Sequence, residues 1–249
     1  MISMTERVRI LNTEVDNYTM DEAVDAIRNM VLLRGNAYVV TPNLDHLINI
    51  DEDPEFEAAY RDADLILADG ISLVLLAKLL HVPLKEKVSG SDLFPRVCAM
   101  AAREGFSLYI LGAAKGVAEK AGEKMQAKNP GLVIAGTYSP PFGFENDEEE
   151  IRQIIEKVTD AKPDIMAIAL GGKKGEKFIH QYRDKLSVPL SMSVGAAIDF
   201  AAGNIKRAPA WVSRCGFEWL YRAVKEPNRI GKRVIRDILG LFPLIRKSK

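Results

Sequence analysis

Short apolar runs alternate with segments of helical period over roughly the first 200 residues of the chain. Aliphatic and β-branched residues predict six strands, at 37–41, 65–68, 107–111, 133–136, 165–170 and 190–194. Strands that alternate with helices are typical of a parallel sheet with helices packed on both of its faces. We therefore expect an α/β fold with a Rossmann-like, doubly wound, mostly parallel sheet.

Apolar positions at three- and four-residue spacing predict the helices between these strands. The expected ranges are 43–62, 72–80, 92–104, 115–128, 147–160 and 174–186. Before the first strand of the sheet, a β-ribbon is expected near 8–15. Thr19 and Glu22 then have the spacing of a capping box and open a further helix. The apolar stripe of that helix includes Val24, Ile27 and Val31.

The charges of the chain are divided unevenly, although they sum to zero over its 249 residues. Residues 203–249 carry 12 basic and 3 acidic side chains, which leaves 22 basic and 31 acidic side chains before them. Such a segment either meets an anionic partner, such as phosphate, nucleic acid or a membrane face, or docks on the acidic remainder. We expect one domain at 1–202 and a basic helical appendage at 203–249.

Composition and cysteine usage narrow the class of protein. Apolar residues make up 47% of the chain, which is ample for a large core. Cys98 and Cys215 form no CxxC pair, the first residues lack the apolar stretch of a signal peptide, and no uninterrupted apolar run of about 18 residues occurs. We expect a reduced, cytoplasmic protein without a membrane-spanning helix.

The residues that follow the predicted strands are the candidates for a ligand site, because ligands of such sheets bind beyond the carboxyl ends of the strands. Glycine lets the backbone turn sharply and approach a ligand closely, and the amides at the start of the next helix suit phosphate oxygens. The candidates at this edge are Thr41, Asn43, Asp69, Gly112, Gly136, Gly171 and Gly195.

Each of these positions also has an ordinary structural interpretation. Asp69 ends an apolar strand and is suited to act as a general base, but it is equally suited to cap a helix that begins near Ser72. Thr41 and Asn43 fit a turn and a helix N-cap. For Asp199, a helix cap is favoured over a phosphate contact.

Other segments do not match the dinucleotide-binding, P-loop or metal-binding motifs that they resemble. Segment 112–116 is not GxGxxG, and segment 171–175 is not a P-loop because Glu176 stands where lysine is required. The Asp62-Ala63-Asp64 triplet resembles a metal-binding DxD, but it precedes a strand and so lies at the wrong end of the sheet. The histidines and cysteines have no ligand spacing. We expect no metal and no cofactor.

Taken together, the motifs resemble one family, the bacterial WecG/TagA/CpsF glycosyltransferases (glycosyltransferase family 26). The matching stretches occur in family order over nearly the whole chain, and the last two are the most specific. They read "VVTPNLDHL", "ADLILADGIS", "EKVSGSDL", "LYILGAAKGVAEKA", "KPDIMAIALGG" with "GEKFI", "SVGAAIDFAAGNIKRAPAW" and "FEWLYRAVKEPNR".

The resemblance implies an inverting, metal-independent transfer of a sugar, N-acetylmannosamine or its uronic acid in well-known members, from a UDP-sugar to a sugar carried on polyprenyl diphosphate. Such enzymes make cell-surface polysaccharide and wall teichoic acid. By the resemblance, Asp69 is the base, and Thr41 and Asn43 line the pocket. The family arginines thought to reach the donor diphosphate correspond to Arg207, Arg222 and Arg229.

The chain departs from the family pattern at several positions. A family arginine is Lys87 here, which keeps the charge but loses the two-pronged hydrogen bonding of a guanidinium. A pocket glutamine is Gly175, which offers no side-chain hydrogen bond. The last glycine of a family "DGxG" motif is Ser72 here, in Asp69-Gly70-Ile71-Ser72, and a family aromatic is Ile198. These departures motivate an alternative function, a non-catalytic protein that binds a nucleotide-sugar or a lipid head group.

The end of the chain predicts a basic amphipathic helix. Its apolar positions at three- and four-residue spacing are Ile230, Val234, Ile238, Leu241 and Ile245. Such a helix lies in a membrane interface, and a lipid-linked acceptor is reached from there. The same stripe also fits packing on the domain or in a homo-oligomer. We expect a peripheral protein on the inner face of the cell membrane, and no nucleic-acid partner, because no nucleic-acid motif occurs.

Overall fold

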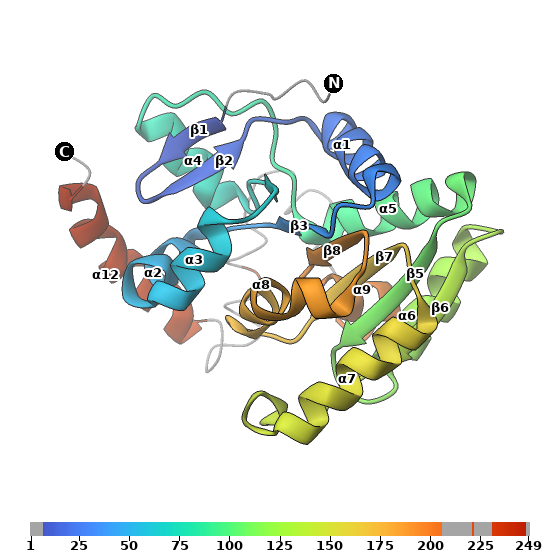
Figure 1. Cartoon of the computed structure of the whole chain (residues 1–249). Helices are drawn as coiled ribbons and strands as arrows, with labels where there is room; N and C mark the ends of the chain where they lie inside the picture. The colour runs from blue at the N-terminus through green and yellow to red at the C-terminus, as the bar shows by residue number, and fades with distance from the viewer. Residues whose placement is uncertain (1–6, 206–220, 222–230, 248–249) are drawn as a thin grey trace.

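A six-stranded parallel sheet forms the centre of the molecule in the computed structural model, which describes residues 7–205, 221 and 231–247 (Figure 1). Every neighbouring pair of its strands is parallel, which confirms the expected fold class. In spatial order the strands are β4 (Leu65–Ile66), β3 (Ala37–Val40), β8 (Leu190–Ser193), β7 (Ile165–Ala169), β5 (Ser107–Gly112) and β6 (Val133–Tyr138).

Helices cover both faces of this sheet, so the doubly wound arrangement is confirmed. Successive side chains of a strand point to opposite faces, and Val39 accordingly joins one core cluster while Tyr38 and Val40 join the other. The first face is covered by α1 (Met20–Leu33), α5 (Gly90–Glu104), α6 (Val117–Lys128) and α9 (Ala197–Ala202).

The second face carries more elements, including the expected ribbon as an antiparallel hairpin. The hairpin is tied to the sheet, because Asp16 pairs with Arg7 and accepts a hydrogen bond from the Ile66 backbone N–H at 2.8 Å. The elements on this face are β1 (Arg7–Ile10), β2 (Thr13–Asp16), α2 (Leu44–Glu52), α3 (Pro54–Arg61), α4 (Ile71–Leu79), α7 (Glu148–Ala161), α8 (Lys174–Leu186), the 3₁₀ turn η1 (Phe144–Asn146) and part of α12 (Lys232–Lys247).

Local sequence signals account for the helix boundaries. The capping box of α1 is present as expected, with the Thr19 hydroxyl accepting from Glu22 and the Glu22 carboxylate accepting from Thr19. The single helix expected over 43–62 is wrong, because Pro54 stops it and Asp53 begins α3 as its N-cap. Strand β4 is shorter than expected, and the short α9 was not anticipated.

Helix α12 packs against α2 at one end of the molecule (Figure 1). Its Gly240 approaches Ile48 so closely that a Cβ atom there would lie 2.9 Å from a methyl carbon. Leu244 is buried, and Leu241 and Ile245 pack beside it, so this part of the stripe packs on the domain. The opposite side exposes Leu239 and Phe242, each to 64%.

The described residues contain no helix that is long and apolar enough to cross a bilayer. The expected division at residue 203 coincides with Gly203, which ends α9 in a left-handed conformation with φ of 72°. The assignment of separate domains stays a prediction.

Gly136 gives the first test. It lies within β6, opposite Tyr109, and a Cβ atom there would meet the Tyr109 ring at 2.5 Å. The expectation that Gly136 follows the strand is therefore wrong. Glycine at this position lets the Tyr109 ring pack against the backbone of β6.

We expect Gly136→Ala to lower the free energy of unfolding by about 1–3 kcal/mol in urea denaturation. Gly35→Ala, with open space around residue 35, is the control and should stay within about 0.5 kcal/mol. Equal effects would contradict this explanation.

Candidate active site

A crevice is expected where the chain reverses its direction across the sheet, between the carboxyl ends of β3 and β8. Strand β3 leads into α2 on the second face, and its neighbour β8 leads into α9 on the first face. The two connections diverge, which leaves the ends of these strands uncovered by either helix. Thr41 follows β3 here, and Gly195 follows β8.

Asp69 lies directly beside this switch point. Its backbone N–H donates to the Pro42 carbonyl at 2.8 Å, so the end of the β4 segment is fixed against the Thr41-Pro42-Asn43 turn. The side chain of Asp69 is half-buried. Helix α4 has Gly70 at its N-cap, with φ of 89°, so the interpretation of Asp69 as that cap is wrong. A carboxylate is thereby placed at the edge of the sheet where β3 and β4 end.

Thr41 connects the end of β3 to the end of β8. Its buried hydroxyl donates a long hydrogen bond, 3.5 Å, to the Ser193 carbonyl. Gly90, the first residue of α5, closes on the same point, since a Cβ atom there would lie 3.0 Å from the Val194 carbonyl oxygen and 3.4 Å from the Thr41 hydroxyl. The start of α5 is therefore packed closely against Thr41 and the segment that follows β8.

Asn43 is the N-cap of α2, so the structural interpretation of this residue is confirmed. Its side-chain oxygen accepts from the His46 backbone N–H at 3.3 Å. Within the described part of the chain, its side-chain NH₂ group makes no hydrogen bond. Capping thus uses only the acceptor of the amide and leaves its donor for a ligand.

Lys87 also lies at this edge. The Val88 backbone N–H donates to the Ala68 carbonyl at 2.9 Å, which places the segment beside the residue that precedes Asp69. The Lys87 ammonium pairs with Asp92 at 3.0 Å, and the same carboxylate oxygen accepts from the Ser89 hydroxyl at 2.6 Å. This pairing fixes the direction of a side chain that remains partly exposed.

The candidate glycines divide into two groups. Gly171 and Gly195 are exposed and have positive φ, and a Cβ atom at either residue would meet no other atom within 4 Å, so a ligand can approach their backbone. At Gly112, glycine is explained by packing, because a Cβ atom there would lie 2.5 Å from the Ala169 carbonyl oxygen. Strand β5 lies four strands from β4, or roughly 19 Å. Gly112 is therefore remote from Asp69.

The lysines beside Gly171 are held by internal ion pairs. Lys173 and Lys177 both contact Asp53, at 2.7 and 2.8 Å, and Lys174 contacts Glu145 at 2.6 Å. Burial opposes ionisation of Asp53, but the hydrogen bonds from the two lysines hold the pKa of this carboxyl well below its ordinary value. The contacts with Asp53 anchor this segment to the junction of α2 and α3, and the contact with Glu145 anchors it to η1.

Sequence reasoning missed a set of buried polar residues behind the edge of the sheet. Glu176 is only 4% exposed and accepts a hydrogen bond from the Ser193 hydroxyl at 2.8 Å. That hydroxyl lies 3.2 Å from the position of a Cβ atom at residue 175, so any larger residue than Gly175 would have to displace the Ser193 side chain slightly. The buried Tyr60 belongs to the same set, and its hydroxyl lies 3.2 Å from Nδ1 of the partly exposed His46. Only His46, three residues after Asn43, had a sequence signal, the spacing of a capping box.

The other candidate motifs lie elsewhere or act differently. Asp62 ends α3 and pairs with His180, and Asp64 accepts from the Tyr38 backbone N–H, so the triplet lies at the amino end of the sheet as expected. No group of three or more His, Cys, Asp or Glu residues arranged for a metal occurs in the described part of the chain. The cap proposed for Asp199 is wrong, because Ala196 is the N-cap of α9.

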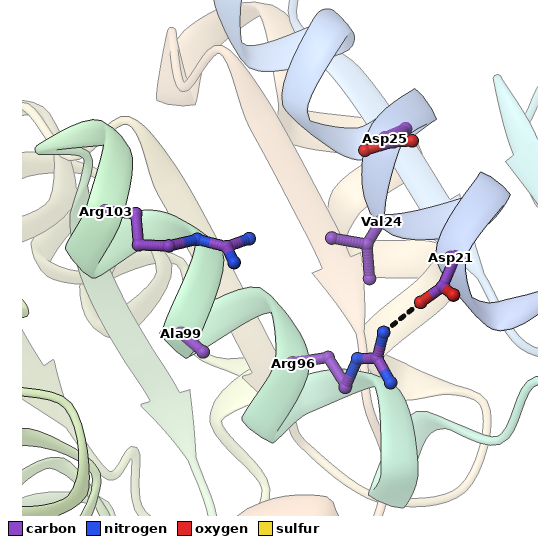
Figure 2. Close-up of a pocket in the computed structure, with 6 residues that line it drawn as sticks. All are labelled: Asp21, Val24, Asp25, Arg96, Ala99 and Arg103. Carbon is purple, nitrogen blue, oxygen red and sulfur yellow. Dashed lines mark hydrogen bonds and ion pairs between the residues drawn. The ribbon is translucent and has the colours of Figure 1, made fainter.

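A hollow of the described surface lies between α1 and α5, away from the ends of β3 and β8 (Figure 2). It has a volume of about 390 Å³, and an ion pair between Arg96 and Asp21 crosses it. Val24, Ala99 and Arg103 lie around this pair in Figure 2. Because the hollow is on the first face of the sheet and contains none of the candidate residues, it is separate from the site.

Comparison with known proteins decides the family. The model of the glycosyl transferase WecG/TagA/CpsF family matches residues 8–249. The chain belongs to this family. A relative from Bacillus spizizenii, an N-acetylglucosaminyldiphosphoundecaprenol N-acetyl-beta-D-mannosaminyltransferase, is 35% identical over 78% of this chain and 73% of its own length. Proteins with the same name in Bacillus subtilis and Staphylococcus aureus are 31% and 27% identical, over 78% and 99% of this chain and 73% and 95% of their own lengths.

The WecG/TagA/CpsF protein described here is therefore a glycosyltransferase. The structure brings together Asp69, Thr41 and Asn43, with Lys87 beside them. Arg207, Arg222 and Arg229, the arginines expected at the donor diphosphate, lie outside the described residues. The roles of all these residues stay predictions.

Asp53 supplies a test of how the loop after β7 is anchored. We expect Asp53→Asn to lower the free energy of unfolding by about 1 kcal/mol at pH 7, because asparagine keeps the N-cap acceptor but loses the charge that pairs with Lys173 and Lys177. The folded-state pKa of Asp53 is depressed, so its contribution is complete above about pH 4 and is lost as the pH falls further.

Urea denaturation at pH 7 and at pH 3 measures this contribution. Glu55→Gln is the matched control, since Glu55 contacts Lys177 from an exposed position and should contribute little. A pH-independent difference between Asp53→Asn and the unmodified protein would contradict the ion-pair explanation.

Proposed function

We propose that this glycosyltransferase moves an N-acetylmannosamine-type sugar from a UDP-sugar onto a sugar carried by polyprenyl diphosphate, with inversion and without a metal ion. The names of its relatives support the type of sugar and the acceptor, because they specify an N-acetylmannosaminyl group and an undecaprenyl-diphosphate-linked N-acetylglucosamine. The observation that carries the proposal is the placement of Asp69 against the Thr41-Pro42-Asn43 turn at the switch point of the sheet.

Transfer requires three things: a deprotonated acceptor hydroxyl, an anomeric carbon held in line, and neutralisation of the charge on departing UDP. Asp69 takes the proton as the acceptor oxygen attacks the face opposite the leaving group, which inverts the anomeric centre. The side-chain NH₂ of Asn43 and the position of Thr41 orient the donor, and holding both substrates in line lowers the entropic part of the barrier.

Charge on the leaving diphosphate is met by cations and backbone amides. The exposed backbone at Gly171 and Gly195 allows close approach of phosphate oxygens. Arg207, Arg222 and Arg229 are proposed to supply guanidinium groups, which bind phosphate with two parallel hydrogen bonds. Lys87 supplies a further positive charge from the other side of Asp69. Its pairing with Asp92 keeps the ammonium in place before the substrate binds.

We further propose that the protein works on the cytoplasmic face of the membrane as a peripheral protein. The acceptor is anchored in the bilayer by its polyprenyl chain, so the enzyme must reach the membrane surface. Helix α12 supports this, because Leu239 and Phe242 face away from the domain and the exposed Arg236 and Arg246 lie on the same helix. A homo-oligomer stays a prediction.

Substitution of Asp69 tests the proposed base. We expect Asp69→Asn to lower kcat about 10²- to 10⁴-fold with little change in donor KM, because the amide cannot accept the proton. Release of UDP is measured from UDP-N-acetylmannosamine with a short-chain lipid diphosphate that carries N-acetylglucosamine. Asp62→Asn, at the opposite end of the sheet, is the control and should retain activity.

The outcomes separate the proposed enzyme from its alternative. Undiminished turnover by Asp69→Asn would remove Asp69 as the base. Calorimetric binding of the nucleotide-sugar by the unmodified protein, with no turnover on any donor, would favour the non-catalytic binding protein that Gly175 and Lys87 motivate.

The exposed side of α12 gives a test of the membrane contact. We expect the double substitution Leu239→Ser with Phe242→Ser to lower the affinity for vesicles of anionic phospholipid by roughly tenfold or more, as measured by co-sedimentation. The serine side chains lack the apolar surface that leucine and phenylalanine would bury in the membrane interface. Leu32→Ser with Leu33→Ser removes two exposed leucines from the end of α1 and should leave binding unchanged. Equal loss in both double variants would contradict contact through α12.

A further inference from the structure

The start of α2 is held by a histidine where helices ordinarily use an acid or an amide. In a capping box, the third residue of the helix is usually Glu or Gln, and its side chain accepts from the N-cap backbone N–H. Here that residue is His46, and its Nδ1 atom lies 3.3 Å from the backbone nitrogen of Asn43. The residue expected to line the pocket is thus fixed by an imidazole nitrogen.

This contact determines the tautomer of His46. A backbone N–H can only donate, so Nδ1 must accept and the proton of the neutral ring must lie on Nε2. The Tyr60 hydroxyl also lies 3.2 Å from Nδ1. Burial, followed by the charges of Glu176, Asp69 and Asp45, raises the pKa of Tyr60 well above its ordinary value, so the phenol keeps its proton and donates it. Two donors therefore share one nitrogen.

The ring is enclosed on the side of α3. The centroids of Phe56 and Tyr60 lie 5.7 and 6.0 Å from that of His46, and both aromatic side chains are fully or almost fully buried. These contacts support one face of a ring that itself remains partly exposed. Figure 1 shows the two helices side by side.

Charged groups surround this arrangement from four elements. Asp45 lies next to His46 on α2 and pairs with Arg236 of α12, whose guanidinium also donates to the Asn49 side chain. Asp69 follows β4, and Glu176 lies in the first turn of α8. Both of these carboxylates act on Tyr60. A change in the charge of His46 would therefore be felt by the proposed base through Tyr60 as well as through Asn43.

We propose that His46 is a positioning residue that holds Asn43, and with it the turn that contacts Asp69, only while its imidazole is neutral with the proton on Nε2. Protonation puts a hydrogen on Nδ1, directly facing the Asn43 N–H, so the capping bond is lost and the Tyr60 hydroxyl must reverse. Pro42, which accepts from the Asp69 backbone, lies next to Asn43 in the same turn.

The direction of the effect follows from this chemistry. The neutral form is the competent one, because only in that form does Nδ1 accept from the Asn43 N–H. Turnover should therefore fall as the imidazole becomes protonated in acid. The effect on turnover rests on the proposed function, whereas the tautomer does not.

A pair of substitutions at His46 separates positioning from simple packing. His46→Gln supplies the usual capping-box acceptor and cannot titrate, whereas His46→Leu fills the site without an acceptor. We expect His46→Gln to retain most of the kcat/KM of the unmodified protein at pH 8. Its kcat/KM should fall less steeply toward pH 5.5 than that of the unmodified protein. His46→Leu should lose about fivefold in kcat/KM at pH 8 and show a similarly flattened profile. An acid limb that is identical in His46→Gln and the unmodified protein would overturn the proposal.

Nuclear magnetic resonance of the histidine rings provides a readout that needs no turnover. The chain has only three histidines, and the signals missing in His46→Gln identify those of His46. Long-range ¹H–¹⁵N spectra at pH 8 should show the proton on Nε2, and the Asn43 amide shift should follow protonation of the ring. A proton on Nδ1 at pH 8 would overturn the proposal. If the unmodified protein turns over no donor, the proposed function fails, and the ring spectra still decide the tautomer.

Discussion

The structure depends on how three neighbouring strand ends, those of β4, β3 and β8, are fixed at one edge of the sheet. The Asp69 backbone N–H bonds to the Pro42 carbonyl, and the Thr41 hydroxyl bonds to the Ser193 carbonyl, so each strand end is tied to the next. Gly90 fits against two of them, at a distance that no larger residue tolerates without displacing backbone. A carboxylate on such a frame needs little reorganisation to meet a substrate.

A second layer of polar residues supports this frame. Glu176 holds Ser193, whose carbonyl bonds to Thr41, and His46 with Tyr60 holds Asn43. Glu176 and Tyr60 are buried, whereas His46 is partly exposed. Asp53 anchors the loop that carries Gly171 through two lysines. A basic residue of the C-terminal segment also forms an internal ion pair. Arg236 is paired with Asp45 and is therefore not wholly available to a diphosphate or a membrane.

The sequence predicted the parallel sheet, its six strands, the hairpin and the α1 capping box, because each follows from apolar periodicity or local capping. The placement of Asp69 beside Thr41 and Asn43 was also predictable, since parallel strands end at one edge. The break at Pro54 had a local signal that the prediction did not use, an N-cap Asp53 followed by proline in the first turn of a helix. The roles of Gly112 and Gly136 were missed because their close neighbours, Ala169 and Tyr109, come from adjacent strands. Glu176 pairs with a residue 17 positions away, which no local pattern contains.

The most direct test of the central claim is a crystal structure of the protein with UDP-sugar and an acceptor analogue bound. The diphosphate should lie between the ends of β3 and β8, with the acceptor hydroxyl within about 3 Å of the Asp69 carboxylate and in line with the anomeric carbon. A nucleotide bound in the hollow between α1 and α5, or an acceptor hydroxyl out of reach of Asp69, would contradict the account.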